Sequence, residues 1–340
     1  MQVTKNPSSA SVPDRALPHR TESNSNRVQW VLMAYFVVIT LFVMLAKGYI
    51  LFQVSQVLVF SIAIVGLNLL IGYSGQLSLG HGAFFALGAY GAAILVQQFQ
   101  LPVLLAIPAV GLICMVTGFL FGFPASRLAG HYLALATFAL SIAMPQLLKH
   151  KSLEQWTGGA QGLVIDRPGA PVGIPLNTDQ WFLIVIAIFA ACLFVVAKNL
   201  MHSRIGRALE ALRDQPVAAQ TMGINTTMNR ATIFGISAMY VGMAGALGGL
   251  LTQFVSPDSY SLALSISLLV GVVLGGATRL EGAVLGAIFV LYMPNVLEHF
   301  SKSAPGALYG LLLIAVILLM PGGLAGAFNR LYVRWRSSQP

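Results

Sequence analysis

Residues 49–71 read YILFQVSQVLVFSIAIVGLNLLI, a stretch without a single charged side chain. A helix needs about 20 apolar residues to cross the hydrocarbon core of a bilayer, and this stretch is long enough. A soluble fold exposes too much surface to hide many stretches of this kind. The stretch therefore predicts a helix that spans a membrane.

The rest of the chain repeats this pattern. Of the 340 residues, 57% are hydrophobic and only 9% are charged, whereas a soluble domain carries about 25% charged residues. We predict an all-α integral membrane protein, a polytopic bundle of about ten transmembrane helices. The expected spans are 28–46, 49–71, 77–97, 102–122, 131–149, 181–199, 231–253, 262–279, 283–300 and 306–321.

The third expected span begins irregularly. It follows Gly72-Tyr73-Ser74-Gly75 and is rich in glycine throughout. Non-helical backbone at membrane depth is tolerated only where protein or a water-filled cavity surrounds it. We therefore predict that the third segment is broken or re-entrant.

Basic residues predict the orientation, because short cytoplasmic loops carry an excess of Lys and Arg. With the N-terminus inside, fourteen basic residues fall on the inner side and five on the outer side. Both termini are then cytoplasmic. We expect a disordered tail over 1–27, a single membrane domain over 28–329 and a second cytoplasmic tail over 330–340. The net charge of +9 follows from this topology and does not indicate a nucleic-acid partner.

The outer connection, residues 150–180, is too long for a simple turn. It contains Trp156 and three closely spaced glycines, Gly158, Gly159 and Gly162. These glycines could form a backbone nest for a carboxylate or a contact for another protein. They could equally be ordinary turn residues.

The inner connection, residues 200–230, has the pattern of an exposed helical element. A basic helix-forming stretch comes first. Pro216 suits the first turn of a second, short helix, and Gly223 suits its left-handed end. Thr226 or Thr227 suits the cap of the next span. Such a well-delimited element predicts a docking surface, and the alternative is a plain amphipathic surface helix.

A cluster of polar residues surrounds the start of the third span. Polar groups are costly inside a membrane, about 2.5–3.5 kcal/mol for a central charge, so they are candidates for function. They would line the substrate path if backbone N–H groups at a broken helix bind a carboxylate. Alternatively, they satisfy one another and shape a tight turn. The members are Asn68, Ser74, Gly75, Gln76, Ser78 and His81.

Glycine pairs four residues apart indicate close helix packing, since they let backbones approach. We expect most of them to pack within one bundle and one or two to face a partner. The pairs are Gly118/Gly122, Gly245/Gly249, Gly271/Gly275, Gly282/Gly286 and Gly306/Gly310.

Neither a metal site nor a cofactor site is predicted. The two cysteines, Cys114 and Cys192, both lie inside apolar stretches and are expected to be core residues. The sequence has no Gly-x-x-x-x-Gly-Lys-Ser/Thr phosphate loop. If ATP and magnesium drive this protein, another chain binds them.

The inner connection resembles the coupling loop of ABC importer permeases, whose pattern is Glu-Ala-Ala-x-x-x-Gly followed by Ile-x-Leu-Pro. The matching positions are Ala218, Ala219, Gly223 and Ile233. Val217 replaces the glutamate, and Gly235-Ile236 replace the final Leu-Pro. The resemblance implies that the short helix docks into a groove on an ATPase and transmits its motion. It also implies that Arg213, Asp214 and Pro216 belong to this ATPase-coupling element.

A second resemblance covers residues 68–225. Asn68–Tyr90 is similar to the signature stretch of branched-chain amino acid permeases of the LivM type, as are Trp156–Leu163 and Arg207–Asn225. The sister LivH-type permeases share the arginine-rich loop but differ around the Gly-Gln-Leu-Ser-Leu-Gly-His stretch. The chain is therefore identified as a member of the LivM type.

This resemblance implies an importer in the bacterial inner membrane, embedded in lipid. Its parts are this permease, a second LivH-type permease, two ATPases and an extracytoplasmic binding protein that meets the outer loop around Trp156. The two permeases form the path, and no covalent chemistry occurs in this chain. Leucine, isoleucine and valine are the default substrates, while urea, short amides and aromatic acids stay open.

Two other classes of function are weaker alternatives. A secondary transporter or a channel for a small urea-like or amide-like solute would fit the composition, but ion coupling usually needs a charged residue at mid-membrane. No Asp or Glu lies at the centre of an expected span. An intramembrane serine protease would use Ser74 with His81 or His131 as base. Such enzymes place the two residues on different helices, whereas Ser74 and His81 are close in sequence.

Overall fold

The structure is a computed structural model and describes most of the chain. The described residues are 48–128, 130–167, 169–170, 176–300, 305–319, Gly323 and Gly326. The first expected span, 28–46, and the two expected tails lie outside them.

Each expected span within the described residues corresponds to a helix. The helices are α2 (Tyr49–Asn68), which continues as the π-helix η1 (Leu69–Tyr73), α3 (His81–Gln97), α4 (Val103–Ala125), α5 (Gly130–Leu148), α7 (Thr178–His202), α10 (Thr226–Thr252), α11 (Leu262–Gly275), α12 (Gly282–Phe300) and α13 (Pro305–Leu319). Among the described residues, six helices are long and apolar enough to cross a bilayer, while α3 and α11 are shorter. A polytopic helical membrane protein is confirmed.

The irregular backbone expected in the third segment lies before α3 and not within it. Helix α2 passes directly into η1, residues 75–80 form no regular structure, and α3 then runs unbroken from His81. Gly75 ends the π-helical region with φ +69°, a conformation that glycine adopts without strain. Single-turn π-helical segments inside α-helices occur frequently at functional sites.

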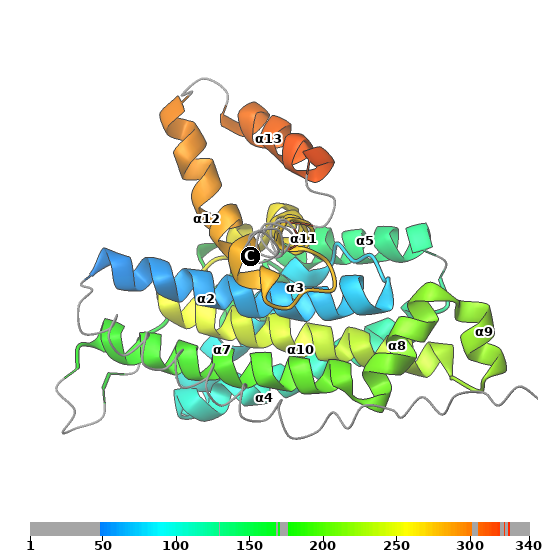
Figure 1. Cartoon of the computed structure of the whole chain (residues 1–340). Coiled ribbons are helices and arrows are strands. Elements are labelled where there is room, and N and C mark those ends of the chain that lie inside the picture. Colours follow the sequence, from blue (N-terminus) through cyan, green and yellow to red (C-terminus); the bar gives the residue numbers. More distant parts are fainter. Residues whose placement is uncertain are drawn as a thin grey trace, which may run out of the picture.

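Helix α10 lies at the centre of the bundle, beside α2, α3 and α4 (Figure 1). Glycines bring the backbones close together. A β-carbon on Gly88 of α3 would overlap the carbonyl group of Gly242 of α10, and one on Gly245 would overlap that of Phe85. Close approach of this kind maximises van der Waals contact between helices that are apolar on every side.

Helices α11 and α12 pair in the same way. A β-carbon on Gly286 would overlap the carbonyl of Gly271, and one on Gly275 would overlap that of Gly282. These pairs pack within the chain, as expected for most of them. By contrast, Gly310 of α13 has no described atom within 4 Å of its β-position.

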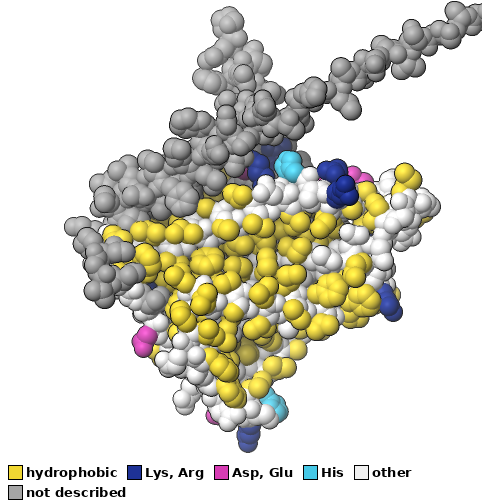
Figure 2. All heavy atoms as spheres, turned by 90° about the horizontal axis from the view of Figure 1, so that it is seen from below, with side chains coloured by type: hydrophobic (Ala, Val, Ile, Leu, Met, Phe, Trp, Pro, Cys, Tyr) yellow, Lys and Arg dark blue, Asp and Glu magenta, His cyan; other side chains and the backbone are white. Residues whose placement is uncertain are grey.

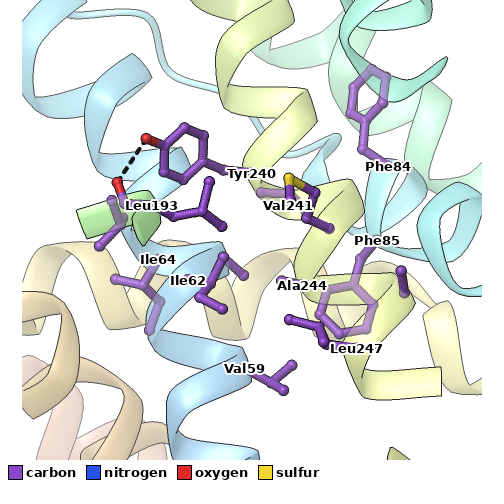
Figure 3. Close-up of a cluster of buried hydrophobic side chains, with 14 of the residues drawn as sticks. Val59, Ile62, Ile64, Phe84, Phe85, Leu193, Tyr240, Val241, Ala244 and Leu247 are labelled. Carbon is purple, nitrogen blue, oxygen red and sulfur yellow. Dashed lines mark hydrogen bonds between the residues drawn. The ribbon is translucent and has the colours of Figure 1, made fainter. Parts of the chain in front are cut away.

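The buried core lies where α2, α3, α7 and α10 meet (Figure 3). It is built from aliphatic and aromatic side chains, among them Ile62, Phe85 and Leu247. The hydroxyl of the buried Tyr240 donates a hydrogen bond to the carbonyl of Leu193 at 2.8 Å. This bond satisfies the one polar group that Tyr240 brings into the core.

On the face that Figure 2 shows, the bundle is apolar over a broad field, with charged side chains at its margins. Helix α4 alone exposes several large apolar side chains, namely Leu104, Leu105, Leu112, Ile113, Val116 and Leu120. Apolar surface of this extent is stable only when lipid or another protein covers it.

The two ends of the bundle differ, and α10 connects them. At the basic end lie α8 (Arg204–Asp214) and α9 (Pro216–Thr221); at the sheet end, β1 (Leu163–Val164) and β2 (Phe254–Val255) pair antiparallel. The sheet end also carries the 3₁₀-helices η2 (Lys151–Leu153), η3 (Gly159–Gln161) and η4 (Pro257–Tyr260) and the short α6 (Glu154–Thr157).

The described basic residues divide unequally between the two ends. The basic end has Arg127, Lys198, Arg204, Arg207, Arg213, Arg230 and Arg279, and the sheet end has Lys149, Lys151 and Arg167.

Candidate functional site

The polar residues predicted around the third segment lie together in the interior, near the basic end. The side chains of Asn68, Ser74, Gln76, Ser78 and His81 are all buried. They occupy the end of α2, the irregular stretch and the first residue of α3. We call this set, together with Gly75, the polar junction.

The ring of His81 lies between two serines. Its Nδ1 is 2.9 Å from Ser78 Oγ, and its Nε2 is 2.8 Å from Ser237 Oγ. The Ser237 hydroxyl donates to the carbonyl of Gly66 at 2.7 Å, so its oxygen accepts the proton on Nε2. Ser78 accepts the Gly80 amide at 3.3 Å and donates its own proton to Nδ1. This pattern fits a neutral His81 protonated at Nε2.

Three more hydroxyl groups hold the start of α3. The amide of Leu79 donates to the Thr137 hydroxyl at 3.0 Å, and its carbonyl accepts from Ser141 at 2.6 Å. The amide of Gly82 donates to the Ser265 hydroxyl at 2.8 Å, and Ser265 Oγ is 2.7 Å from Ser141 Oγ. Helices α5 and α11 therefore supply the caps that the start of α3 lacks in its own sequence.

The sequence interpretation missed these partners, Thr137, Ser141, Ser237 and Ser265. The signal that could have found them is a hydroxyl residue inside an apolar span. Thr137 and Ser141 are four residues apart and so share one face of α5. This spacing does not predict which helix the two hydroxyl groups contact.

The other end of the polar junction is tied to the turn between α11 and α12. The Asn68 amide donates to the carbonyls of Arg279 at 3.1 Å and Gly276 at 3.4 Å, and its oxygen accepts the Thr278 amide at 3.0 Å. The Tyr73 hydroxyl donates to the Thr278 carbonyl at 2.8 Å. One side chain from α2 thus satisfies the backbone of a distant turn.

Ser74 and Gln76 complete the junction at the side of α10. The Gln76 amide donates to Ser74 Oγ at 2.6 Å and to the carbonyl of Arg230 at 3.3 Å. With this contact, the segment from residue 68 to residue 82 is hydrogen-bonded to α5, α10, α11 and the α11–α12 turn.

Arg213 joins α8 to the polar junction. Its Nη1 donates to the carbonyl of Gly72 in the π-helix at 2.8 Å, and its Nε donates to the adjacent Asp214 at 2.8 Å. A β-carbon on Gly75 would lie only 3.0 Å from Arg213 Cγ. The absence of a side chain at Gly75 therefore leaves room for Arg213 to reach the end of α2.

These contacts agree with one of the two interpretations of the cluster. The described polar side chains satisfy one another and nearby backbone groups, and the amides of Leu79, Gly80 and Gly82 already have acceptors. A carboxylate would need other donors in this conformation. That the junction lines the substrate path stays a prediction.

The protease alternative finds no support at this site. The Ser74 hydroxyl accepts from Gln76, and both ring nitrogens of His81 are occupied by other serines. His131 is exposed at the start of α5. The serine–histidine pairs considered for that mechanism are therefore not hydrogen-bonded to each other. Among the described residues, no group of three or more His, Cys, Asp or Glu side chains could hold a metal ion.

The short helix predicted within residues 200–230 is present at the basic end. Pro216 is the first residue of α9, and Gly223 follows that helix with φ +83°, as the sequence predicted. The cap of α10 was predicted wrongly. Asn225 caps it by accepting the Met228 amide at 3.0 Å, because its side chain reaches forward to the first turn, where the two following threonines are already helical.

The side chains of α9 and of the residues that follow it face in two directions. Val217 and Met222 are 74% and 84% exposed, whereas Ala219 is only 5% exposed. Ile233 is buried inside α10. Ala218 lies in α9, where its carbonyl accepts the Thr221 hydroxyl at 2.8 Å. The apolar side chains that could meet a partner are therefore Val217 and Met222.

The loop at the sheet end is well structured. Trp156 stacks on Phe99 with ring centroids 6.5 Å apart. Gly158, Gly159 and Gly162 all have positive φ. A β-carbon on Gly162 would overlap the Val255 carbonyl beside the small sheet. Turn formation and close packing thus account for these glycines, while a contact with a binding protein stays a prediction.

Arg167 ties this loop to two helices. Its guanidinium donates to Asp179 at the start of α7 and to the carbonyl of Leu251 near the end of α10. The loop is thereby attached to the bundle at the sheet end.

Fold and site together define a class of protein, a polytopic helical membrane protein with a compact helical element at its basic end. The comparison with sequence families shows which family of this class the chain belongs to. A family described as "Branched-chain amino acid transport system / permease component" matches residues 49–321. The chain belongs to this family, a non-catalytic membrane component of ABC transporters.

Individual relatives agree with the LivM resemblance. The chain is 31% identical over 287 residues to the high-affinity branched-chain amino acid permease LivM of Salmonella typhimurium, covering 77% of this chain and 67% of that protein. The Escherichia coli LivM is 32% identical over 277 residues, covering 74% and 64%. The chain thus spans about two thirds of these relatives' length. The LivH permease of Salmonella typhimurium is 22% identical over 298 residues, covering 78% of this chain and 91% of that protein. No solved structure matches.

Proposed function

We propose that this chain is the LivM-type permease subunit of a bacterial ABC importer and forms the path for branched-chain amino acids with a second, LivH-type permease. The observation that carries the proposal is the family match over 49–321. Two separate ATPases would bind ATP and magnesium, and an extracytoplasmic binding protein would deliver the substrate. The sequence predicts about ten spans with both termini in the cytoplasm, which would make the basic end cytoplasmic.

Helix α9 is the proposed docking surface for an ATPase. Its exposed Val217 and the adjacent Met222 would fill an apolar groove on that partner. Arg213 then carries movement of α8 to the π-helix through its bond to the Gly72 carbonyl. From there the hydrogen bonds of residues 68–82 connect to α5, α10, α11 and the α11–α12 turn, so a shift of the docking element would reach these four parts of the bundle.

The test is a pull-down of the tagged chain from native membranes in mild detergent, with mass spectrometry of what co-purifies. Val217→Asp places a charge in the proposed contact without disturbing the buried Ala219. We expect the parent to bring two ATPases and a second permease, and the variant to lose at least about 90% of the ATPases while keeping the permease.

The matched control is Val164→Asp at the sheet end. Val164 is 68% exposed, close to the value for Val217, and lies at the opposite end of the bundle. This variant should retain the ATPases in full. If the parent comes out alone, or if both variants retain the ATPases equally, the proposed ATPase contact is wrong and a channel or secondary transporter becomes the better hypothesis.

A further inference from the structure

A cavity of about 410 Å³ lies at the sheet end, between α2, α3, α10 and α11 and beneath the 3₁₀-helix η4. It is separate from the polar junction, and no motif of the sequence pointed to it. A volume of this order holds one small ligand.

The walls of the cavity are mainly apolar and aromatic. Phe60 and Phe85 have ring centroids 6.2 Å apart, and Phe85 and Tyr260 have centroids 5.9 Å apart. Leu251 and Leu264 contribute aliphatic surface. None of the described residues that line the cavity is charged. A charged side chain would lose its hydration here without gaining a partner, whereas an aliphatic or aromatic one would be stabilised.

Three polar side chains on the lining remain available. The Gln56 amide and the hydroxyls of Ser259 and Tyr260 make no hydrogen bond to a residue that the structure describes. The Thr252 hydroxyl, by contrast, is used by carbonyls of its own helix and of Phe254. A ligand with an apolar body and a polar head would match a cavity whose walls are mainly apolar and carry a few available polar groups.

The turn above the cavity is held in place from three sides. Lys149 at the end of α5 pairs with Asp258 of η4 at 2.5 Å. The β1–β2 pairing fixes the chain before η4, and the Ile165 amide donates to the Gln253 carbonyl at 2.9 Å. The cavity is therefore preformed, which reduces the entropy that binding would cost.

We propose that this cavity receives the apolar side chain of the transported amino acid, with Gln56 and Tyr260 next to its polar head. The inference rests on the proposed function and adds a selectivity site within this chain, at the end that would receive substrate from the binding protein. The site favours branched and aromatic side chains over charged ones.

The test uses the complete reconstituted importer and compares saturated transport rates of valine, leucine and phenylalanine. Leu264→Ala enlarges the cavity and should raise the phenylalanine-to-valine ratio about tenfold, the usual effect of a small volume change in an apolar pocket. Gly248→Ala places a methyl group 3.0 Å from Phe85 Cζ, narrows the cavity and should lower the same ratio. Dividing each rate by that of the parent cancels the preference of the binding protein.

Opposite shifts cannot come from misfolding, which would reduce all rates together. Leu112→Ala on the exposed face of α4 is the control and should leave the ratio unchanged. If both cavity variants change the three rates in parallel, the proposed selectivity site is wrong. If the parent importer transports none of the three amino acids, the proposed function itself fails, so the two failures are distinguishable.

Discussion

Helices α10 and α4 lie side by side, yet they meet different surroundings. In its most apolar stretch α10 is 83% buried and α4 only 33% buried. The more exposed helix, α4, is nevertheless the more apolar of the two. In a soluble protein the order would be reversed, because water would drive the apolar helix inside.

This difference in burial indicates which interactions place a helix at the centre of the bundle. When lipid is the solvent, apolar side chains gain nothing by leaving the surface, so close backbone approach and polar pairing decide which helix is central. Helix α10 supplies both, through Gly242 and Gly245 and through Ser237. Helix α4 presents leucines to the outside and packs against α10 through its glycines Gly118 and Gly122.

The largest effect is expected where α3 crosses α10. Gly88→Leu would place a side chain where the backbone of Gly242 already lies. A backbone cannot move aside as a flexible side chain can, so we expect no folded protein in the membrane. Fluorescence-detected gel filtration of a tagged variant measures this.

Gly130→Leu is the matched control, because no described atom lies within 4 Å of its β-position. It should give close to the parent's yield. Equal yields from the two variants would show that close backbone contact does not determine the centre of the bundle.

The second prediction compares the same substitution on the two helices. Leu247 of α10 is fully buried, and Leu112 of α4 is 60% exposed. Leu247→Ala should destabilise the protein by about 2–5 kcal/mol, since it leaves a cavity. Leu112→Ala should change stability by less than about 0.5 kcal/mol, because lipid replaces the lost contacts. Unfolding in mixed micelles measures both. A loss at Leu112 as large as that at Leu247 would mean that another protein covers α4.

The position of the helices could be predicted from sequence, because apolar length is a local property. The start of α10 shows the limit of prediction from hydropathy. The apolar pattern predicted 231–253, but the helix begins at Thr226, since Asn225 caps a polar first turn that hydropathy does not detect. Pro216 and Gly223 were predicted correctly because each acts through its own backbone preference.

The environment of the polar junction could not be predicted in the same way. His81 and Ser237 are 156 residues apart, and Gly82 and Ser265 are 183 residues apart. Both faces of most spans are apolar, so periodicity does not tell which face meets which neighbour. The cavity at the sheet end could not be predicted for the same reason, because its lining comes from six separate elements.

The smallest effect is expected for a substitution that tests whether hydrogen bonds between buried polar groups stabilise the centre of the bundle. Ser237→Ala removes the acceptor of His81 Nε2 and the donor to the Gly66 carbonyl. A buried group left without a partner costs about 1–3 kcal/mol, and we expect a loss of that size in the same unfolding assay.

The matched control for that change is Ser267→Ala on α11. Its hydroxyl donates only to the Ala263 carbonyl of its own helix, at 2.9 Å. That carbonyl already takes part in the helix, so the change should cost no more than a few tenths of a kcal/mol. If Ser237→Ala were as mild, the hydroxyl groups would be incidental, and glycine packing alone would explain why α10 and not α4 lies at the centre.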